Sequence, residues 1–300
     1  MTPTTGERKS PRARRVSLQL RDLEILEAVY THRVLSSAQI AALFFRSTKD
    51  EVNSACRTRL RMLVAEGLLE RHEQPVTRAE GRRPFLFMPT ESGCHYIAYE
   101  LGLDPTELDW KPSFNSVRWP FLAHQLAIND LYVTVRRACA RLDWALEKWI
   151  DDRFLRKSHG APLQLPGAPE GHVVVPDAYF AVRNGVGLFQ FFVEIDRATM
   201  AVAPTSLATK SWQRRIQGYQ ALYDSPVLAK LYDTASIRVL TITTGPRRLL
   251  NLKESIEQVG GQRRYWLATT TDVTPATMFT EPVWHVASIA DRRALLTFDP

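Results

Sequence analysis

The chain has 300 residues, which predicts two domains at roughly 150 residues each. Its composition, 45% hydrophobic and 24% charged, is that of a globular protein, and no apolar run approaches the roughly 18 residues of a membrane span. These features exclude an integral membrane protein. Because no apolar segment follows the N-terminal arginines, we expect a cytoplasmic protein without a signal peptide. Three widely spaced cysteines predict reduced thiols rather than disulfides or a zinc site.

The positive charge is concentrated in the N-terminal third of the chain. Residues 1–83 hold 16 Lys and Arg against 10 Asp and Glu, whereas residues 84–300 hold 23 against 22. A basic segment of this kind is typical of a surface that meets a polyanion. The sequence therefore favours nucleic acid as the partner of this third, with an acidic protein as the alternative.

The first predicted elements are a basic arm and three helices. Residues 1–16 are rich in Thr, Pro, Ser and Arg without an apolar period, which predicts a disordered arm. Apolar residues at helical spacing predict a first helix from Leu18, and Ser36 caps a short second one. A cap at Ser47 or Thr48 predicts a longer third helix, which ends at about residue 66. Three closely connected helices are the skeleton of a helix-turn-helix.

The predicted third helix has two distinct faces. Its expected buried stripe is apolar and contains Val52, Ala55, Cys56, Leu60, Met62 and Leu63. Its opposite face is basic and polar and contains Ser54, Arg57, Thr58 and Arg61. Arg57 and Arg61 are one turn apart, a spacing at which two guanidiniums reach guanine edges or phosphates in a major groove. We interpret this face as a DNA-recognition surface; the alternative is an ordinary solvated face.

A basic hairpin is predicted to follow the third helix. Two short strands, Leu68–His72 and Pro84–Pro89, flank a turn region whose arginines are Arg78, Arg82 and Arg83. Arginines at a hairpin tip are suited to phosphate or minor-groove contact. Residues 17–103 are therefore predicted to form a winged helix-turn-helix DNA-binding domain, followed by a proline-containing linker over residues 104–120.

The remainder, residues 121–300, is predicted to be one α/β domain with a mixed sheet flanked by helices. The pattern begins with a long helix and a strand, continues with two β-rich runs joined by a glycine loop, and ends with alternating helices and strands. The predicted ranges are 119–141, 144–150, 172–182, 188–196, 206–223, 237–243, 247–259 and 264–270.

Two carboxylates are predicted to face each other on the glycine-linked hairpin. If its loop is centred between Gly185 and Val186, Asp177 lies opposite Glu194, with Cβ atoms about 4.5–5.5 Å apart. That separation suits one shared divalent cation, Mg²⁺ or Mn²⁺, and period two places Asp196 on the same face as Glu194. The alternative is that these acids pair with arginines such as Arg197.

The order of these elements resembles the PD-(D/E)XK, restriction-endonuclease-like fold. In that family the Asp and Glu bind Mg²⁺, and a Lys two residues after the Glu positions or activates the attacking water. The resemblance makes Asp177 and Glu194 the candidate catalytic and metal-binding residues, but the lysine position holds Asp196. A carboxylate cannot stabilise developing negative charge as an ammonium does. Lys210, on the next predicted helix, is the candidate substitute.

The whole chain more closely resembles the replication-relaxation family of plasmid and mobile-element proteins. The stretches that carry this resemblance are the third helix ending in Glu66-Gly67-Leu68-Leu69, residues 124–131, Pro176-Asp177-Ala178, and residues 191–199 with their Glu-x-Asp-Arg-x-Thr run. The resemblance implies a winged-helix DNA binder joined to a nuclease-like domain, with a role in plasmid replication or transfer.

Together these features predict a sequence-specific double-stranded-DNA-binding protein that acts in replication, transfer or transcriptional control. Binding would need no cofactor, and a homodimer and replication or transfer proteins are the expected partners. One alternative is a Mg²⁺- or Mn²⁺-dependent nuclease or nickase using Asp177, Glu194, Asp196 and Lys210. Another is an accessory protein that recruits a replication or transfer enzyme. No Gly-Lys-Ser/Thr phosphate loop is present, which argues against a P-loop ATPase.

Overall fold

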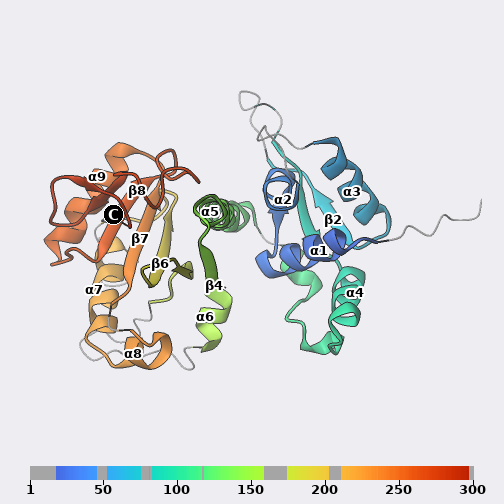
Figure 1. The fold of residues 1–300 in the computed structure, drawn as a ribbon, viewed down its shortest axis with the longest axis horizontal. Coiled ribbons are helices and arrows are strands. Elements are labelled where there is room, and N and C mark those ends of the chain that lie inside the picture. The colour runs from blue at the N-terminus through green and yellow to red at the C-terminus, as the bar shows by residue number, and fades with distance from the viewer. Residues whose placement is uncertain are drawn as a thin grey trace, which may run out of the picture.

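The structure, a computed structural model, describes residues 18–45, 53–75, 81, 83–116, 118–158, 174–202, 211–234 and 236–296. Figure 1 shows two parts with the long helix α5 (Trp119–Leu142) between them. Helices α1 to α4 and a small sheet form the N-terminal part, and a larger sheet with its own helices forms the C-terminal part. No helix in the described ranges is long and apolar enough to cross a membrane.

The N-terminal part packs four helices against a three-stranded antiparallel sheet of order β1-β3-β2. Its elements are α1 (Leu20–His32), β1 (Leu35–Ser36), α2 (Ser37–Phe44), α3 (Ser54–Ala65), β2 (Leu69–His72), β3 (Leu86–Pro89) and α4 (Glu91–Leu101). A capping box starts α2, since the Ser36 side chain accepts from the Gln39 N–H and the Gln39 side chain accepts from the Ser36 N–H. The cap predicted at Ser36 is therefore confirmed.

The third helix begins later than the sequence predicts. Its N-cap is Asn53, whose side chain accepts a hydrogen bond from the Cys56 N–H at 2.8 Å, so the predicted start at Ser47 or Thr48 is wrong. The amide of Asn53 supplies the cap that the prediction assigned to an earlier hydroxyl. Residues 46–52, including Val52 of the predicted stripe, lie outside the described residues. Ala55 is exposed, so its place on the predicted buried stripe is wrong, whereas Cys56, Leu60 and Leu63 are buried as predicted.

A buried ion pair joins α1 to α3. Asp22, which is fully buried, accepts hydrogen bonds from Nε and Nη2 of Arg59 and from the backbone N–H of Gln19. Asp22 therefore satisfies an orphan donor at the start of α1 and also holds the arginine of α3. Arg59 faces the interior of this part, unlike its neighbours on the outer face of the same helix.

We predict that Arg59→Ala destabilises the protein by about 3 kcal/mol, because it leaves the buried carboxylate of Asp22 unpaired. The matched control is Arg57→Ala, an exposed arginine two positions away on the same helix, which should change stability by less than about 0.5 kcal/mol. Urea unfolding of both variants measures the difference. Equal losses in the two variants would show that the Asp22–Arg59 pair does not hold α1 to α3.

The C-terminal part is built on a seven-stranded mixed sheet of order β10-β9-β8-β7-β6-β5-β4. Strands β4, β5 and β6 are antiparallel, β6, β7 and β8 run parallel, and β9 and β10 add antiparallel strands. The strands are β4 (Ala145–Asp151), β5 (Ala178–Arg183), β6 (Leu188–Asp196), β7 (Arg238–Thr243), β8 (Tyr265–Thr269), β9 (Trp284–Val286) and β10 (Arg292–Arg293). The predicted mixed α/β sheet is confirmed.

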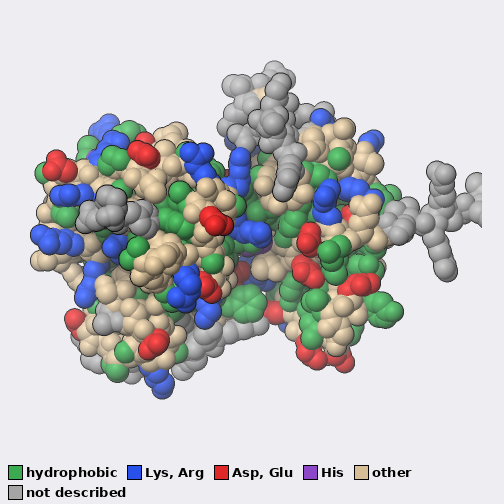
Figure 2. Space-filling model, in the orientation of Figure 1, with side chains coloured by type: hydrophobic (Ala, Val, Ile, Leu, Met, Phe, Trp, Pro, Cys, Tyr) green, Lys and Arg blue, Asp and Glu red, His purple; other side chains and the backbone are tan. Residues whose placement is uncertain are grey.

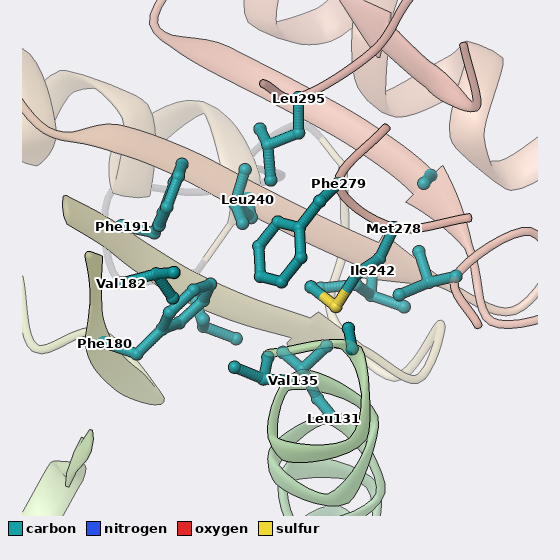
Figure 3. Close-up of a cluster of buried hydrophobic side chains, with 14 of the residues drawn as sticks. Leu131, Val135, Phe180, Val182, Phe191, Leu240, Ile242, Met278, Phe279 and Leu295 are labelled. Atoms are coloured by element: carbon teal, nitrogen blue, oxygen red, sulfur yellow. The ribbon is translucent and has the colours of Figure 1, made fainter. Parts of the chain in front are cut away.

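Helices cover both faces of this sheet, and each face has its own apolar core. Besides α5, the helices are α6 (Asp152–Ser158), α7 (Trp212–Tyr223), α8 (Val227–Tyr232) and α9 (Pro246–Gln258). On one face Leu131 and Val135 of α5 pack with Phe180, Phe191 and Ile242 (Figure 3). On the other, α7, α8 and α9 pack against alternate residues of the same strands. Period two therefore directs Phe192, Glu194 and Asp196 of β6 toward α7 and α9.

The register of the β5–β6 hairpin is the predicted one. Ala178 pairs with Val193 and Arg183 pairs with Leu188, so each facing pair keeps the relation that places Asp177 across from Glu194. The Asp177 N–H donates to the Val193 carbonyl at 2.9 Å, which holds Asp177 beside the end of β6, one residue off the register of the paired strands.

Helix α5, which packs against the sheet, also forms hydrogen bonds with the N-terminal part. Asn129, which is fully buried, donates through Nδ2 to the carbonyl oxygens of Val34, at 2.6 Å, and His32, at 3.3 Å. Gln39 of α2 donates through Nε2 to the Leu126 carbonyl at 3.0 Å and to Asp130 Oδ1 at 2.6 Å. The predicted linker contains two short 3₁₀ helices, η1 (Pro105–Glu107) and η2 (Pro112–Asn115).

Candidate functional site

The outer face of α3 is the first candidate site. Ser54, Arg57, Thr58 and Arg61 are all exposed, as the sequence predicts. Arg61 Nη2 donates to Thr58 Oγ1 at 3.4 Å, and within the described residues neither Arg57 nor Arg61 forms an ion pair with an acid. Two arginines and two hydroxyl side chains are therefore available to an external ligand on one side of the helix.

The structure tests the predicted hairpin arginines only in part. Strands β2 and β3 pair in antiparallel fashion, as expected for a hairpin. Arg83 lies just before β3 and is partly buried. Arg78 and Arg82 lie outside the described residues, so their predicted contacts with phosphates stay predictions.

The second candidate site is an acidic centre at the open end of the β5–β6 hairpin, away from its loop. Glu194 is almost fully buried on β6, and Asp177 lies just before β5. The Arg215 guanidinium lies beside both carboxylates, with Nη2 at 2.6 Å from Glu194 Oε2 and 3.7 Å from Asp177 Oδ1. The predicted proximity of the two acids therefore holds, and an arginine of α7 accompanies them.

Every oxygen of the two carboxylates has a partner within the chain. Glu194 Oε1 accepts from the Tyr219 hydroxyl at 2.5 Å, and Glu194 Oε2 pairs with Arg215. Asp177 Oδ2 accepts from the Ile195 N–H at 2.8 Å, and Asp177 Oδ1 lies 3.2 Å from His124 Nε2. Donors from a strand and from helices on both sides of the sheet therefore converge on one pair of acids.

The environment drives the pKa values of these two acids in opposite directions. Burial raises the pKa of Glu194 to about 7; the charge of Asp177 adds to the rise, whereas Arg215 and Tyr219 oppose it. Burial also opposes ionisation of Asp177, but the hydrogen bond from His124 and the charge of Arg215 outweigh it and lower the pKa of that carboxyl. Asp177 is therefore the more firmly ionised of the two.

His124 is part of this centre rather than of the apolar core. It projects from α5, about one-third exposed, toward Asp177. Burial lowers the pKa of His124, but the hydrogen bond with Asp177 and its charge outweigh burial and raise the pKa above its usual value. His124 thus adds a second basic group, beside Asp177.

Asp196 belongs to a separate group of side chains. Its carboxylate accepts from Arg248 Nε at 2.9 Å and Nη2 at 3.0 Å, from the Thr243 hydroxyl at 2.7 Å, and from Trp212 Nε1 at 3.3 Å. These bonds lower the pKa of Asp196 against the effect of burial. Asp196, the second acid of the Glu-x-Asp run, therefore joins β6 to α7, β7 and α9. Lys210 lies outside the described residues.

The residues at this centre do not fit a divalent cation as they are arranged. The Arg215 guanidinium lies where a cation shared by Asp177 and Glu194 would be held, and it already supplies positive charge to both. Among the residues that the structure describes, no three His, Cys, Asp or Glu side chains are grouped to hold a metal ion.

Sequence reasoning missed the importance of Arg215, Tyr219 and Arg248. A signal for the first two was present, because Arg215 is three residues after Trp212 and four before Tyr219, which places it on the apolar face of the helix. A charged residue on such a face calls for a buried partner. The acid that it pairs with could not be inferred, since helical spacing does not show which strand a helix covers.

We predict that Arg215→Met destabilises the protein more at about pH 8 than at about pH 5. Without the guanidinium the pKa of Glu194 rises further above its unfolded value, so folding favours the protonated acid. Stability from a raised carboxyl pKa is present at low pH and lost as pH rises through the folded pKa. The deficit should approach about 3–5 kcal/mol at the higher pH.

Thermal unfolding at the two pH values measures this deficit. The matched control is Arg183→Met, which removes an exposed arginine paired with Glu147 on the same sheet and should cost less than about 1 kcal/mol at both pH values. A deficit for Arg215→Met that does not change with pH would contradict the assignment of Glu194 as its main partner.

Comparison with known proteins identifies a family. Two structures of restriction endonuclease FokI, one bound to DNA, are similar to this chain with 12% identity and a TM-score of 0.26; each match covers 84% of this chain and 43% of that one. The chain thus spans less than half of the FokI chain. No curated protein matches it. Residues 26–233, more than half of the sequence, match the replication-relaxation family, and the chain therefore belongs to the replication-relaxation family.

Proposed function

We propose that this protein binds double-stranded DNA in a sequence-specific manner, through a winged helix-turn-helix domain over residues 17–103. The observation that carries the proposal is the exposed outer face of α3, where Arg57 and Arg61 lie one turn apart among hydroxyl side chains. We further propose that residues 121–300 form a nuclease-like domain that serves assembly or additional DNA contact.

The topology of the N-terminal part supports this proposal. Helix α1, strand β1, helices α2 and α3, and the β2–β3 hairpin follow one another in the order of a winged helix, and β1 closes the sheet beside β3. In such domains the last helix of the helix-turn-helix enters the major groove. That helix here is α3.

The arginines of α3 have different roles. Arg59 pairs with Asp22 and stabilises the fold, whereas Arg57 and Arg61 are exposed and, within the described chain, have no acidic partner. An arginine that is exposed and not neutralised by an acid is available for guanine edges or phosphates. This division within one turn and a half of helix supports a recognition role for the outer residues.

Among the described residues, α5 contacts the N-terminal part away from the outer face of α3. Helix α5 contacts the N-terminal part through His32, Val34 and Gln39, which belong to α1, the segment before β1 and α2. Figure 1 shows α3 on the side of this part away from α5. In Figure 2 blue Lys and Arg side chains lie over the α3 end of this part, and red Asp and Glu side chains gather toward its α4 end. This polarity favours an approach of DNA from the α3 end.

Membership of the replication-relaxation family supports a role in plasmid or mobile-element replication or transfer, and transcriptional control is a further process open to a DNA binder of this kind. Because dedicated helix-turn-helix proteins bind mostly as dimers to two-fold sites, we propose a homodimer on DNA. The replication or transfer proteins of the same element are its proposed protein partners.

We predict that Arg57→Ala lowers the preference for the cognate sequence by about 1–3 kcal/mol, because it removes a contact with base edges. Arg82→Ala should instead weaken binding to all sequences alike and reduce the slope of log K against log salt by about 1. Fluorescence anisotropy with cognate and scrambled duplexes over a range of salt concentrations separates the two effects.

The matched control is Arg141→Ala, an exposed arginine in the last turn of α5, which should leave both affinities unchanged. The DNA would first be selected from a random pool with the full chain. If Arg57→Ala and Arg82→Ala weaken cognate and scrambled duplexes equally, α3 is not the element that reads the bases.

A further inference from the structure

We infer that Arg215 is a built-in replacement for the divalent cation of the Asp177–Glu194 pair, and that a metal site appears only when this side chain is removed. The C-terminal part would then not hydrolyse DNA. This inference rests on the acidic centre alone and is independent of α3.

A cation of the chain already lies at the centre. The Arg215 guanidinium contacts both Asp177 and Glu194, and His124 lies against Asp177. A divalent ion entering the centre would gain little from neutralising the acids and would lie against the guanidinium. The carboxylate oxygens that would bind the ion already have partners in the chain, namely Arg215, Tyr219, His124 and the Ile195 N–H.

Arg215 is held between Glu194 of β6 and the segment before β5. Its Nη2 donates to the Val175 carbonyl at 3.0 Å, close to Asp177, and the same nitrogen lies 2.6 Å from Glu194 on the next strand. The side chain is about one-fifth exposed, so exchange for a hydrated ion would require the guanidinium to leave a mostly buried position. Displacement of the guanidinium would leave both Asp177 and Glu194 without this cationic partner, which is unfavourable for buried acids.

The position that follows Glu194 by two residues is also unsuited to hydrolysis. Asp196 is neutralised by Arg248 and anchored by Thr243 and Trp212, so it neither donates to a phosphate nor carries a proton for a leaving group. Hydrolysis of a phosphodiester needs charge stabilisation at the attacked phosphoryl group and activation of water. Both carboxylate groups of the Glu-x-Asp run are instead used to hold the fold together.

Removal of Arg215 should uncover a cation site. In Arg215→Ala the two carboxylates, one just before β5 and one on β6, would be close together without a shared counter-ion. Hard divalent cations prefer such oxygen ligands. We therefore expect the variant to bind Mn²⁺ at one site and its thermal midpoint to rise with Mn²⁺ concentration, because a ligand that binds only the folded state stabilises it. Wild type should show neither effect.

Electron paramagnetic resonance of free Mn²⁺, together with thermal unfolding, tests this on the full chain. Arg183→Ala is the matched control, since it frees the exposed Glu147 and should create no Mn²⁺ site. Adding Glu194→Gln to Arg215→Ala should abolish the new site. An Arg215→Ala protein that folds but binds no Mn²⁺ would overturn the inference.

A measurement on wild type keeps the inference testable if Arg215→Ala does not fold. Wild type is titrated with Mn²⁺ and incubated with supercoiled DNA in Mn²⁺ buffer, beside Glu194→Gln and the exposed control Glu147→Gln. We expect no stoichiometric Mn²⁺ binding and intact DNA in all three. Mn²⁺ binding or nicking by wild type that Glu194→Gln abolishes and Glu147→Gln retains would contradict the inference.

Discussion

The need to neutralise a carboxylate inside the sheet determines much of this structure. Glu194 is on β6, a central strand, and is 1% exposed. A buried carboxylate is unfavourable unless it is paired and hydrogen-bonded. Arg215 and Tyr219 of α7 meet that need on one side, and Asp177 brings in His124 of α5 from the other. The two acids together thus link the hairpin to helices of both layers.

Helix α5 connects this acidic centre to the N-terminal part. His124 reaches the acidic centre, and Asn129, just over one turn later, binds the backbone on either side of Arg33. The side chain of Gln39 adds contacts to the same helix. The N-terminal part is therefore held through α1, α2 and the segment before β1, while α3 remains exposed.

Local patterns predicted the hairpin better than the site around it. The glycine loop and the alternation of β5 and β6 suffice for the register that places Asp177 across from Glu194, because both are properties of adjacent segments. Arg215 comes from a helix whose docking depends on the whole sheet. Asp22 shows the same limit: its place in the first turn of α1 suggests a helix-dipole role, but its pairing with Arg59 needs the packing of α1 on α3. Strands as short as β9 and β10 carry too few residues to show an alternation.

The most direct test is a dimethyl sulfate footprint, in Mn²⁺ buffer, of the full chain on DNA that it has selected from a random pool. Dimethyl sulfate methylates guanine N7, which lies in the major groove, where the outer face of α3 is proposed to bind. If α3 binds the major groove, guanines in the selected site should be protected from methylation. If Arg215 takes the place of a divalent cation at the acidic centre, the DNA strands should remain full length. No enriched sequence, no major-groove protection, or cleaved strands would contradict these expectations.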